Sequence, residues 1–511
     1  MSLKADLDAL IPRSDFRIAR DTDDSLMSTT MKITDLEIGA FTFGALRKPD
    51  FQRETSDWEP KKIVELISSF LNGDLIPAII LWKNGDLLFV IDGSHRLSAL
   101  IAWVQDDYGD GERSRKFFDY QLPEEQEKAA EQTRKIVEER LGAYRDHQNA
   151  IKDPDKYPPE TVARARRLGG LALQLQWVRG DAEKAEESFL RINQQASLIS
   201  QEEMLLIKSR RKPNAIAARS IIRRGTGHKY WSGFSERVQA EVQDLAQEVY
   251  ELLFTPALQY PIKNIELPIG GRVYSSTGLT MVFDFVNLCA GAESSDDIDG
   301  SKTIEYLKRC RRVARLLSSK EPSSLGLHPA IYFYSWTGKQ QPILLLVVTK
   351  LIMDLELHKK LPAFIAVRRP FEEFLLKNKP LINQVVRKYG TKGSGKKHLL
   401  DFYQYLLNAF SDTVDAGEVL ARLASAPHYS FIQPGEIAYS SSSGAQFSSD
   451  VKSGVIIQEC FKAALRCAIC GGFVPSQAIS IDHKKRRVEG GSSDAANAQV
   501  AHPYCNTGIK T

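Results

Sequence analysis

In its first hundred residues the chain has short apolar segments separated by turn residues. Residues 61–71 carry apolar side chains every three or four positions and end at Asn72-Gly73, which predicts an amphipathic helix. Two short apolar segments follow, Ala78 to Trp82 and Leu87 to Ile91. The Asn84-Gly85 step between them is typical of a hairpin turn, so we predict two antiparallel strands.

Farther along, the apolar spacing is mostly helical. The segment Pro123 to Arg179 is rich in Glu, Lys, Arg and Ala, so we expect long solvated helices there, broken near Asp153-Pro154 and Pro158-Pro159. The segment from about Pro213 to Phe431 predicts a helical region, with helices for example at Val238 to Phe254, Thr303 to Leu317 and Pro342 to Leu357. The longest apolar run, 343–348, is too short to cross a bilayer and predicts a core helix.

The composition changes near the carboxyl end. Ser440 to Gly444 and Ser448-Ser449-Asp450 have the composition of a flexible linker, which would free the segment after them to move. We therefore predict an N-terminal mixed domain at 1–212, a helical domain at 213–438, a linker at 439–453 and a C-terminal module at 454–511. The expected fold class is α+β.

Overall composition narrows the function only slightly. A chain of 511 residues has room for two or three domains with real cores. A hydrophobic content of 43% and a charged content of 26% are ordinary for a globular protein. The formal net charge of +4 is small for this length, so any surface that binds nucleic acid must be local.

Cysteine usage bears on the compartment. Six cysteines, not arranged as a dense set of pairs, favour a reducing cytosol over a disulfide framework. Cys289 and Cys310 are expected to be buried small apolar residues. Residues 1–22 mix charges with short apolar pieces and lack the core of a signal peptide. We therefore expect a cytoplasmic protein that has no membrane partner.

The segment 467–511 holds the densest chemistry of the chain. Cys467 and Cys470 are separated by two residues, and so are His502 and Cys505. Two such pairs of ligands can close a tetrahedral site around one zinc ion, at about 2.0–2.3 Å from the metal. The spacing therefore predicts that these four residues bind a structural zinc ion.

Between the two pairs lie residues that a plain zinc ribbon does not need. They are an Asp482-His483 step after a predicted strand at 478–481, a Gly490-Gly491 turn and Asn497, and Asn506 follows the second pair. This order resembles the HNH endonuclease family and its ββα-metal fold. The resemblance implies that His483 is the general base, that Asp482 and Asn506 hold a catalytic Mg²⁺ or Mn²⁺ ion, and that Asn497 orients His483. Asn506 stands where the family name has His, which makes this an H-N-N variant.

These residue types suit phosphodiester hydrolysis. Histidine has a pKa near the operating pH of a general base, and a hard cation on oxygen ligands stabilises charge that builds on a phosphate. The basic run Lys484-Lys485-Arg486-Arg487 would meet flanking DNA phosphates, although a short charge run is also often just a solvated face. The alternative is a structural zinc site in a nucleic-acid-binding regulator without nuclease activity.

In the N-terminal domain, the second predicted strand runs directly into Asp92-Gly93-Ser94-His95-Arg96, and we expect a helix to begin at Leu97. A strand, a glycine turn and a helix N-terminus together present free backbone amides to an anion. Arg96 and His95 would add charge-assisted hydrogen bonds. A tight turn with a surface arginine is the competing interpretation.

Several segments of this domain resemble the ParB/sulfiredoxin-like domain with an Asp-Gly-Gln-Gln-Arg signature, found in modification-dependent (type IV) restriction enzymes and related phage-defence proteins. The resemblance rests on Gln52-Arg53, Ile76-Pro77, Asp92 to Arg96, and Phe189 to Asn193. It implies binding or hydrolysis of a nucleoside triphosphate, coupled to sensing of modified DNA. The implied nucleotide-binding residues are Gln52, Arg53, Asp92, Gly93, Ser94, His95, Arg96, Arg191 and Asn193. Ser94-His95 replace the two glutamines, so hydrolysis and the identity of the nucleotide stay open.

A second glycine-rich stretch, Gly390 to Lys397, has the glycine and lysine spacing of a Walker A loop. Lys397 stands where a Ser or Thr should reach magnesium, and the preceding Leu381 to Tyr389 has the pattern of a charged helix and not of a buried strand. We therefore expect a flexible basic loop that contacts DNA or solvent.

The sequence thus predicts a phage-defence DNA endonuclease that nicks or cleaves DNA. Its N-terminal domain is expected to sense a nucleotide, modified DNA or both, either as a hydrolase of nucleoside triphosphates or as a binding module only. The predicted linker suggests that a ligand at Asp92 to Arg96 changes the position of the HNH module.

Overall fold

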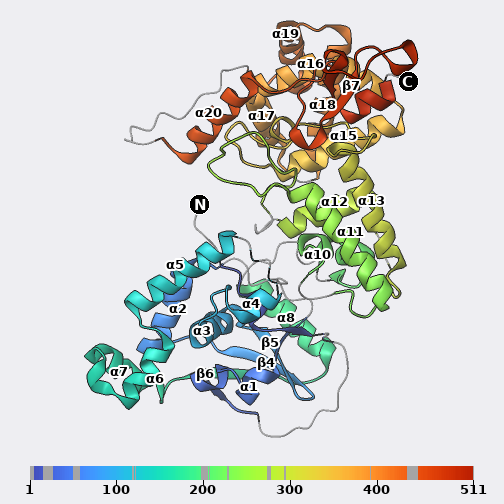
Figure 1. Cartoon of the computed structure of the whole chain (residues 1–511). Helices are drawn as coiled ribbons and strands as arrows, with labels where there is room; N and C mark the ends of the chain where they lie inside the picture. The colour runs from blue at the N-terminus through green and yellow to red at the C-terminus, as the bar shows by residue number, and fades with distance from the viewer. Residues whose placement is uncertain are drawn as a thin grey trace. The chain divides into compact units, whose positions relative to one another are not determined.

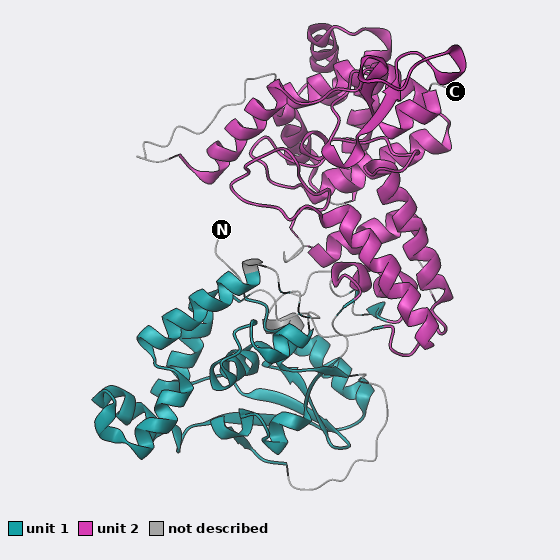
Figure 2. Cartoon of the chain, viewed as in Figure 1, with its two compact units in different colours: residues 1–210, 226–230, 274–276 teal, residues 211–225, 231–273, 277–511 magenta. Residues whose placement is uncertain are grey.

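The structure is a computed structural model of the whole chain. It describes residues 5–14, 16, 27–49, 58–117, 120, 122, 124–196, 205–206, 208–226, 230–272, 278–292, 295–391, 393–433 and 447–509. The chain divides into two compact units, one made mainly of residues 1–210 and the other mainly of residues 211–511 (Figure 2).

Among the described residues, unit 1 is built on a mixed six-stranded sheet with the strand order β1-β3-β5-β4-β6-β2. Figure 1 labels β4, β5 and β6 of this sheet. Its strands are β1 (Arg13–Ser14), β2 (Thr30–Lys32), β3 (Leu46–Pro49), β4 (Ile79–Asn84), β5 (Leu87–Asp92) and β6 (Ala172–Val178). The β4–β5 and β2–β6 pairs are antiparallel, and the other three pairs are parallel.

Helices pack on both faces of this sheet. The helices described in unit 1 are α1 (Phe41–Ala45), α2 (Pro60–Asn72), α3 (Ser94–Gln105), α4 (Glu112–Phe117), α5 (Glu124–Arg140), α6 (Tyr144–Lys152), α7 (Pro159–Leu168) and α8 (Ala182–Ala196). Successive side chains of a strand point to opposite faces of the sheet, so the neighbours of consecutive residues of β5 identify what covers each face. Val90 belongs to the core that includes α2 and α3, whereas Phe89 and Ile91 pack with Phe189 of α8.

The predicted helix and hairpin of unit 1 are confirmed, with one shifted boundary. Helix α2 ends at Gly73, which has a left-handed φ of 75°. In the hairpin, Asn84 pairs with Leu87 across a two-residue turn. Helix α3 begins at Ser94 and not at the predicted Leu97, because the Leu97 N–H already bonds to the Gly93 carbonyl and closes the first helical turn.

The expectation of helices throughout Pro123 to Arg179 is wrong at its end. Helices α5, α6 and α7 are present, but Ala172–Val178 form strand β6 between β4 and β2. The segment alternates in burial, with Leu173 and Leu175 buried and Gln174 and Gln176 exposed. This period of two is the strand signal, and it was hidden by the charged helical sequence before it.

Unit 2 begins with a helical region. Its helices are α10 (Pro213–Ile222), α11 (Glu236–Phe254), α12 (Gly278–Ala290), α13 (Ser301–Leu317), α14 (Pro329–Tyr332), α15 (Pro342–Leu357), α16 (Leu361–Lys377), α17 (Lys379–Tyr389), α18 (Ser394–Asp412) and α19 (Ala416–Ser425). The helices predicted near 238–254, 303–317 and 342–357 are confirmed, and residues 343–349 of α15 are buried. No helix in the described ranges is long and apolar enough to cross a membrane.

The predicted Walker-like loop is not preceded by a strand. Residues before it form helix α17, as expected, and α18 begins at Ser394 within the stretch itself. The ammonium of Lys396 pairs with Asp284 at 2.7 Å. Cys310 is buried, as predicted, and Cys289 is partly buried.

The predicted flexible linker at 439–453 differs from the structure at its carboxyl end. Residues 439–446 lie outside the described residues, but helix α20 (Ser449–Lys462) begins at Ser449. Its first turns are anchored, because Asp450 accepts hydrogen bonds from Tyr260 and Lys339, and the Ser453 hydroxyl accepts one from the Ile262 N–H.

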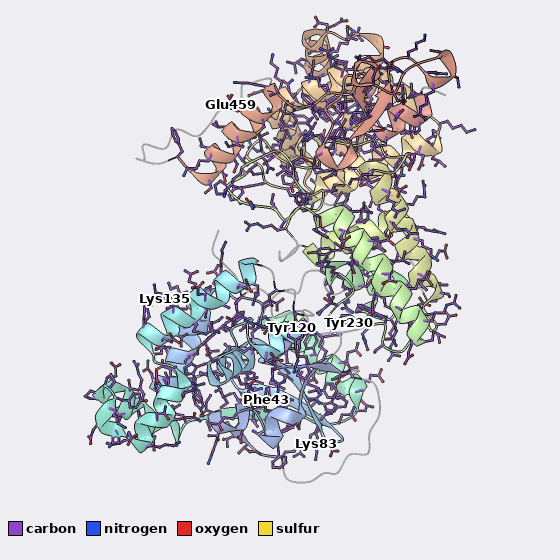
Figure 3. All side chains as sticks on the ribbon, viewed as in Figure 1. Phe43, Lys83, Tyr120, Lys135, Tyr230 and Glu459 are labelled. Atoms are coloured by element: carbon purple, nitrogen blue, oxygen red, sulfur yellow. The ribbon has the colours of Figure 1, made fainter. Side chains whose placement is uncertain are left out.

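Helix α20 has a buried face and an exposed face. Ile457 and Phe461 are buried, whereas the side chain of Glu459 is exposed (Figure 3). The Phe461 ring lies 4.8 Å from His328 and 4.9 Å from Phe473, measured between ring centroids. The helix therefore packs the C-terminal module onto the helical region, and both belong to unit 2. The proposed boundaries between domains at 438 and 453 stay a prediction.

The C-terminal module is small. It contains an antiparallel pair, β7 (Ser480–His483) and β8 (Ala498–Ala501), and a final π-helical turn, η8 (Cys505–Ile509). The short 3₁₀ helix η5 (Ser476–Ala478) precedes β7, and η6 (Arg487–Glu489) and η7 (Ala495–Asn497) lie between β7 and β8. Strand β7 begins two residues later than the predicted 478, because residues 476–478 form η5.

Candidate active site and metal centre

The four predicted zinc ligands come together. The ligand atoms of Cys467, Cys470, His502 and Cys505 all lie within 4.8 Å of one another. Cys467 and Cys470 sit in a turn closed by a hydrogen bond from the Gly471 N–H to the Cys467 carbonyl at 2.8 Å. Gly471 has a φ of 71°, which a residue with a side chain rarely adopts. The turn therefore aims both thiols at the second ligand pair.

The imidazole of His502 is oriented for a metal. Its Nε2 lies 3.0 Å from the Phe473 carbonyl oxygen, so this nitrogen carries the proton and donates it. Its Nδ1 lies 3.3 Å from the Cys470 sulfur and 3.9 Å from the Cys505 sulfur. Metal-bound histidines commonly donate their other N–H in this way, which fixes the tautomer. The three sulfurs and one imidazole nitrogen fit a tetrahedral zinc ion.

The pKa values of the three thiols are shifted in different directions. Hydrogen bonds from Cys470 and Cys505 lower the pKa of Cys467. The same hydrogen bond to Cys467 raises the pKa of Cys470 to about 11, and the pKa of Cys505 is raised by its hydrogen bonds to Cys467 and Cys470. Metal binding must therefore displace thiol protons, which makes affinity depend on pH.

Strand β7 carries Asp482 and His483 side by side in the chain. Asp482 is buried and pairs in register with Gln499 of β8, whose Nε2 donates to Asp482 Oδ2 at 2.7 Å. His483 is partly buried and is the last residue of the strand. Successive side chains of a strand point to opposite faces of the sheet. The side chains of Asp482 and His483 can therefore reach one phosphate only because they lie at the end of the strand.

Asn506 lies beside the first half of β7. Its Nδ2 donates to the Ser480 hydroxyl at 2.8 Å and to the Ile481 carbonyl at 3.4 Å. Ser480 and Asp482 are two residues apart and share a face of the strand. Asn506 is therefore held on the same face as Asp482, and its Oδ1 is the atom available to a cation.

Asn497 contacts the loop after His483, and its expected role in orienting His483 stays a prediction. Its Nδ2 donates to the carbonyls of Lys485 and Ser492 at 3.0 and 2.6 Å, and its Oδ1 accepts from the Lys485 N–H at 2.8 Å. These bonds use both amide hydrogens. Asn497 thus fixes the backbone of the loop 484–492.

The basic run follows directly on β7. Lys484, Lys485 and Arg487 are exposed, and Arg486 is partly buried. The Lys484 ammonium donates to the Ala496 carbonyl at 2.9 Å, and the Arg487 guanidinium contacts the Ser493 hydroxyl at 3.3 Å. The charges therefore stand on a loop whose backbone is held by Asn497.

The N-terminal candidate pocket has the expected strand, glycine and helix order. Gly93 caps α3 with a φ of 93°, and a Cβ there would lie 2.5 Å from Ile79. Arg96 pairs with Asp92 and donates to the Pro77 carbonyl, so its guanidinium ties α3 to the end of β5 and the Ile-Pro step. The His95 ring stacks on Trp58, with centroids 6.0 Å apart. Ser94 is buried.

The structure describes only part of the remaining predicted nucleotide-binding residues. Gln52 and Arg53 lie outside the described residues. Arg191 is exposed on α8, and Asn193 belongs to the same helix but its side chain also lies outside what is described.

The sequence interpretation missed two groups of site residues. Gln499, which holds Asp482, lies on a strand that the sequence analysis did not predict. Arg368 and Glu372 of α16 contact His502 and Phe473, which lie more than a hundred residues away in the chain. No local pattern distinguishes them, because their spacing is that of an ordinary surface ion pair.

Comparison with known protein families matches two parts of the chain. Residues 33–210 match the N-terminal domain of the GmrSD restriction endonuclease, and residues 467–511 match the HNH endonuclease. No curated protein and no solved structure gave a significant match. The match at 33–210 supports the restriction-enzyme resemblance, while the ParB/sulfiredoxin-like assignment stays a prediction. The two matched regions together support a DNA-hydrolysing enzyme of phage defence.

Proposed function

We propose that the C-terminal module hydrolyses phosphodiester bonds of DNA, with His483 as the general base. The observation that carries the proposal is the meeting of three features within residues 467–511: a Cys₃His group, the Asp482-His483 end of β7, and Asn506 beside the same strand. His483 takes a proton from the attacking water. A general base acts within hydrogen-bond reach of the water that it deprotonates.

Asp482 and Asn506 hold the catalytic cation in this proposal. Both offer oxygen atoms from one face of β7, and oxygen is the ligand that Mg²⁺ and Mn²⁺ take. Gln499 binds one carboxylate oxygen of Asp482 and so orients the other. When bound, the ion stabilises negative charge on the scissile phosphate.

The zinc ligands have a structural role in the proposal. They join the turn at 467–470 to residues 502–505, which lie on either side of the β7–β8 pair in the sequence. A closed tetrahedral site of this kind contributes folding energy and leaves no open position for chemistry. The loop residues Lys484 to Arg487 contact DNA phosphates on either side of the cut.

The N-terminal unit senses a nucleotide, modified DNA or both. The support is the restriction-enzyme match at 33–210 and the amides at the start of α3, which are placed for an anion. An incoming phosphate would have to share Arg96 with Asp92 or draw Arg96 away from it. Because α20 and the C-terminal module pack onto the helical region, a signal to His483 passes through that region and does not require a mobile module.

Nicking of supercoiled plasmid tests the nuclease. The zinc-loaded chain is incubated with Mg²⁺ or Mn²⁺ on unmodified DNA and on phage DNAs of differing modification. Nicked or linear product that depends on the added cation is expected, and Asp482→Asn should raise the cation concentration needed. DNA that is bound but stays intact on every substrate would favour the regulator with a structural zinc site.

Added nucleoside triphosphates test the sensor. Each triphosphate is added to the same reactions while phosphate release is measured. A change in nicking is the expected result, and Arg96→Ala should remove it. If a triphosphate changes nicking but no phosphate is released, the N-terminal unit is a binding module. If no triphosphate changes nicking on any of the DNA substrates, the regulatory proposal is ruled out.

A further inference from the structure

Helix α16 carries two charged residues that are fully buried beside the cysteines. The Arg368 and Glu372 side chains both have 0% exposure, and Arg368 Nε lies 2.7 Å from Glu372 Oε1. Buried charges are costly unless their remaining hydrogen-bonding groups are satisfied. Those remaining partners are the loop before α14, Tyr332 of α14, His502, and Phe473 of the segment Cys467 to Phe473, which we call the zinc knuckle.

Arg368 spans from the loop to a metal ligand. Its Nη1 donates to the Leu325 carbonyl at 2.5 Å, and its Nη2 donates to the Gly326 carbonyl at 2.9 Å. The same Nη1 lies 3.3 Å from His502 Nδ1, the imidazole atom that faces the thiols. Because zinc would take the lone pair of this nitrogen, the guanidinium would act there as a neighbouring positive charge and not as a hydrogen-bond donor. A planar guanidinium can make these contacts together, whereas a lysine ammonium cannot reproduce their geometry.

Glu372 fixes the other side of the knuckle. Its Oε2 accepts the Phe473 N–H at 2.7 Å, and its Oε1 also accepts from the Tyr332 hydroxyl at 2.9 Å. The carbonyl of Phe473 is the group that His502 Nε2 contacts. Glu372 therefore holds the residue whose carbonyl sets the tautomer and direction of the metal-binding imidazole.

Two glycines allow this close approach. Gly326 has a φ of 56°, and a Cβ there would lie 2.8 Å from Cδ2 of His502. Across the contact, a Cβ on Gly472 would lie 2.7 Å from Arg368 Nε. Side chains on either glycine would push the helical region and the knuckle apart.

We propose that Arg368 and Glu372 are positioning residues of the zinc centre, supplied by the helical region from outside the matched segment 467–511. Three thiolates, a neutral imidazole and Zn²⁺ leave a net negative charge in a buried place, and the Arg368 cation lies next to it. Glu372 sets the backbone that orients His502. The inference rests on the zinc site but not on DNA cleavage, so failure of the nuclease proposal would leave its test unaffected.

Zinc release from the full chain to a chromophoric chelator is the test. Arg368→Met should weaken zinc binding by about 10- to 100-fold, the usual loss on removing a partner that orients a metal ligand, and zinc release should be correspondingly faster. The matched control is Arg422→Met, which removes an arginine that pairs with Glu418 four residues away but on the surface. Release at the control rate would overturn the proposal.

A double variant separates this role from a general contribution to folding. Arg368→Met with Glu372→Met removes both charges, so the thermal stability lost in the single variant should largely return. Zinc release should stay fast, and the Co²⁺-substituted protein should show altered thiolate charge-transfer bands. Unaltered release and spectra in the double variant would overturn the proposal.

Arg368→Lys provides a conservative variant if methionine prevents folding. It keeps a buried cation but cannot bridge Leu325, Gly326 and His502, so zinc release should still exceed that of Arg422→Lys. Equal release from these two variants would contradict the role assigned to the guanidinium.

Discussion

The backbone N–H of Phe473 donates a hydrogen bond to Oε2 of Glu372 at 2.7 Å. Phe473 lies three residues after Cys470, whereas Glu372 lies on α16 of the helical region. Further hydrogen bonds join the same two parts of unit 2, from the Tyr504 N–H to the Ser324 carbonyl and from the Thr507 hydroxyl to the Pro322 carbonyl. The candidate nuclease is therefore packed onto the helices over several contacts.

Removal of zinc should unfold part of unit 2. Structural zinc contributes apparent binding free energies of about 10–16 kcal/mol in small zinc-binding peptides, so its loss should lower the unfolding temperature markedly. Cys505→Ser should have the same effect as a chelator, measured by calorimetry and zinc content. Cys460→Ser, which alters a cysteine on α20 outside the ligand group, should change neither. Equal behaviour of the two serine variants would contradict the assignment.

Replacing Asn497 should impair cleavage without releasing zinc. Asn497→Ala removes three hydrogen bonds to the backbone of the loop 484–492, so His483 and the basic run lose their support. Misplacement of this kind can cost about 100-fold in rate. Single-turnover cleavage and zinc content are measured together, with the exposed Asn408→Ala as the control. Unchanged cleavage by Asn497→Ala would mean that the loop has no part in the reaction.

The basic run should set the salt dependence of DNA binding. Lys485→Ala and Arg487→Ala each remove one exposed cation, so each should lower the slope of log affinity against log salt by about 1. Lys462 is equally exposed but pairs with Glu459 on α20, and Lys462→Ala should leave the slope unchanged. If all three variants give the same slope, Lys484 to Arg487 form only a solvated face.

Acid should destabilise unit 2 through His328. Burial, together with the smaller effects of the nearby Lys379, Arg368 and His502, lowers the pKa of His328 from 6.5 to about 3. Neither ring nitrogen has a hydrogen-bond partner in the described part of the chain. Between pH 6.5 and 3 the folded state therefore binds fewer protons than the unfolded state. The free energy of unfolding is unaffected by His328 above this window, and it decreases as the pH falls through it.

The contribution of His328 should approach about 1.4 kcal/mol per pH unit, the value for one proton. His328→Phe keeps a ring against Phe461 and removes the titration. Denaturant unfolding at pH 7 and pH 5 should show a shallower loss in the variant, while the zinc ligands contribute equally to both proteins. Identical pH dependence would contradict a buried neutral His328.

Short sequence patterns predicted the features that depend on neighbouring residues, namely helices, the hairpin and the pairs of metal ligands. Apolar spacing gave α15 with both of its ends, and the Asn-Gly step gave the β4–β5 hairpin. The two ligand pairs predicted the Cys₃His group because the two-residue spacing within each pair brings its two donors together. Strand β6 was missed because its alternation follows a long charged helical sequence.

Long-range partners left no trace that could be recognised in the sequence. Arg368 and Glu372 have the same four-residue spacing as their neighbours Arg369 and Glu373, yet the first pair is fully buried and the second is exposed. Only the fold of α16 against the knuckle makes that difference. The serine-rich segment likewise suggested mobility, whereas Asp450 and Ser453 anchor the start of α20 through residues near position 260.

Single-turnover cleavage of plasmid DNA by the zinc-loaded His483→Ala variant tests the central claim most directly. The exposed His428→Ala serves as the control, and DNA affinity and zinc content are measured on the same preparations. We predict that His483→Ala binds DNA and zinc as the unaltered chain does but no longer nicks, while His428→Ala nicks normally. Nicking by His483→Ala at the rate of the control would contradict the assignment of the general base.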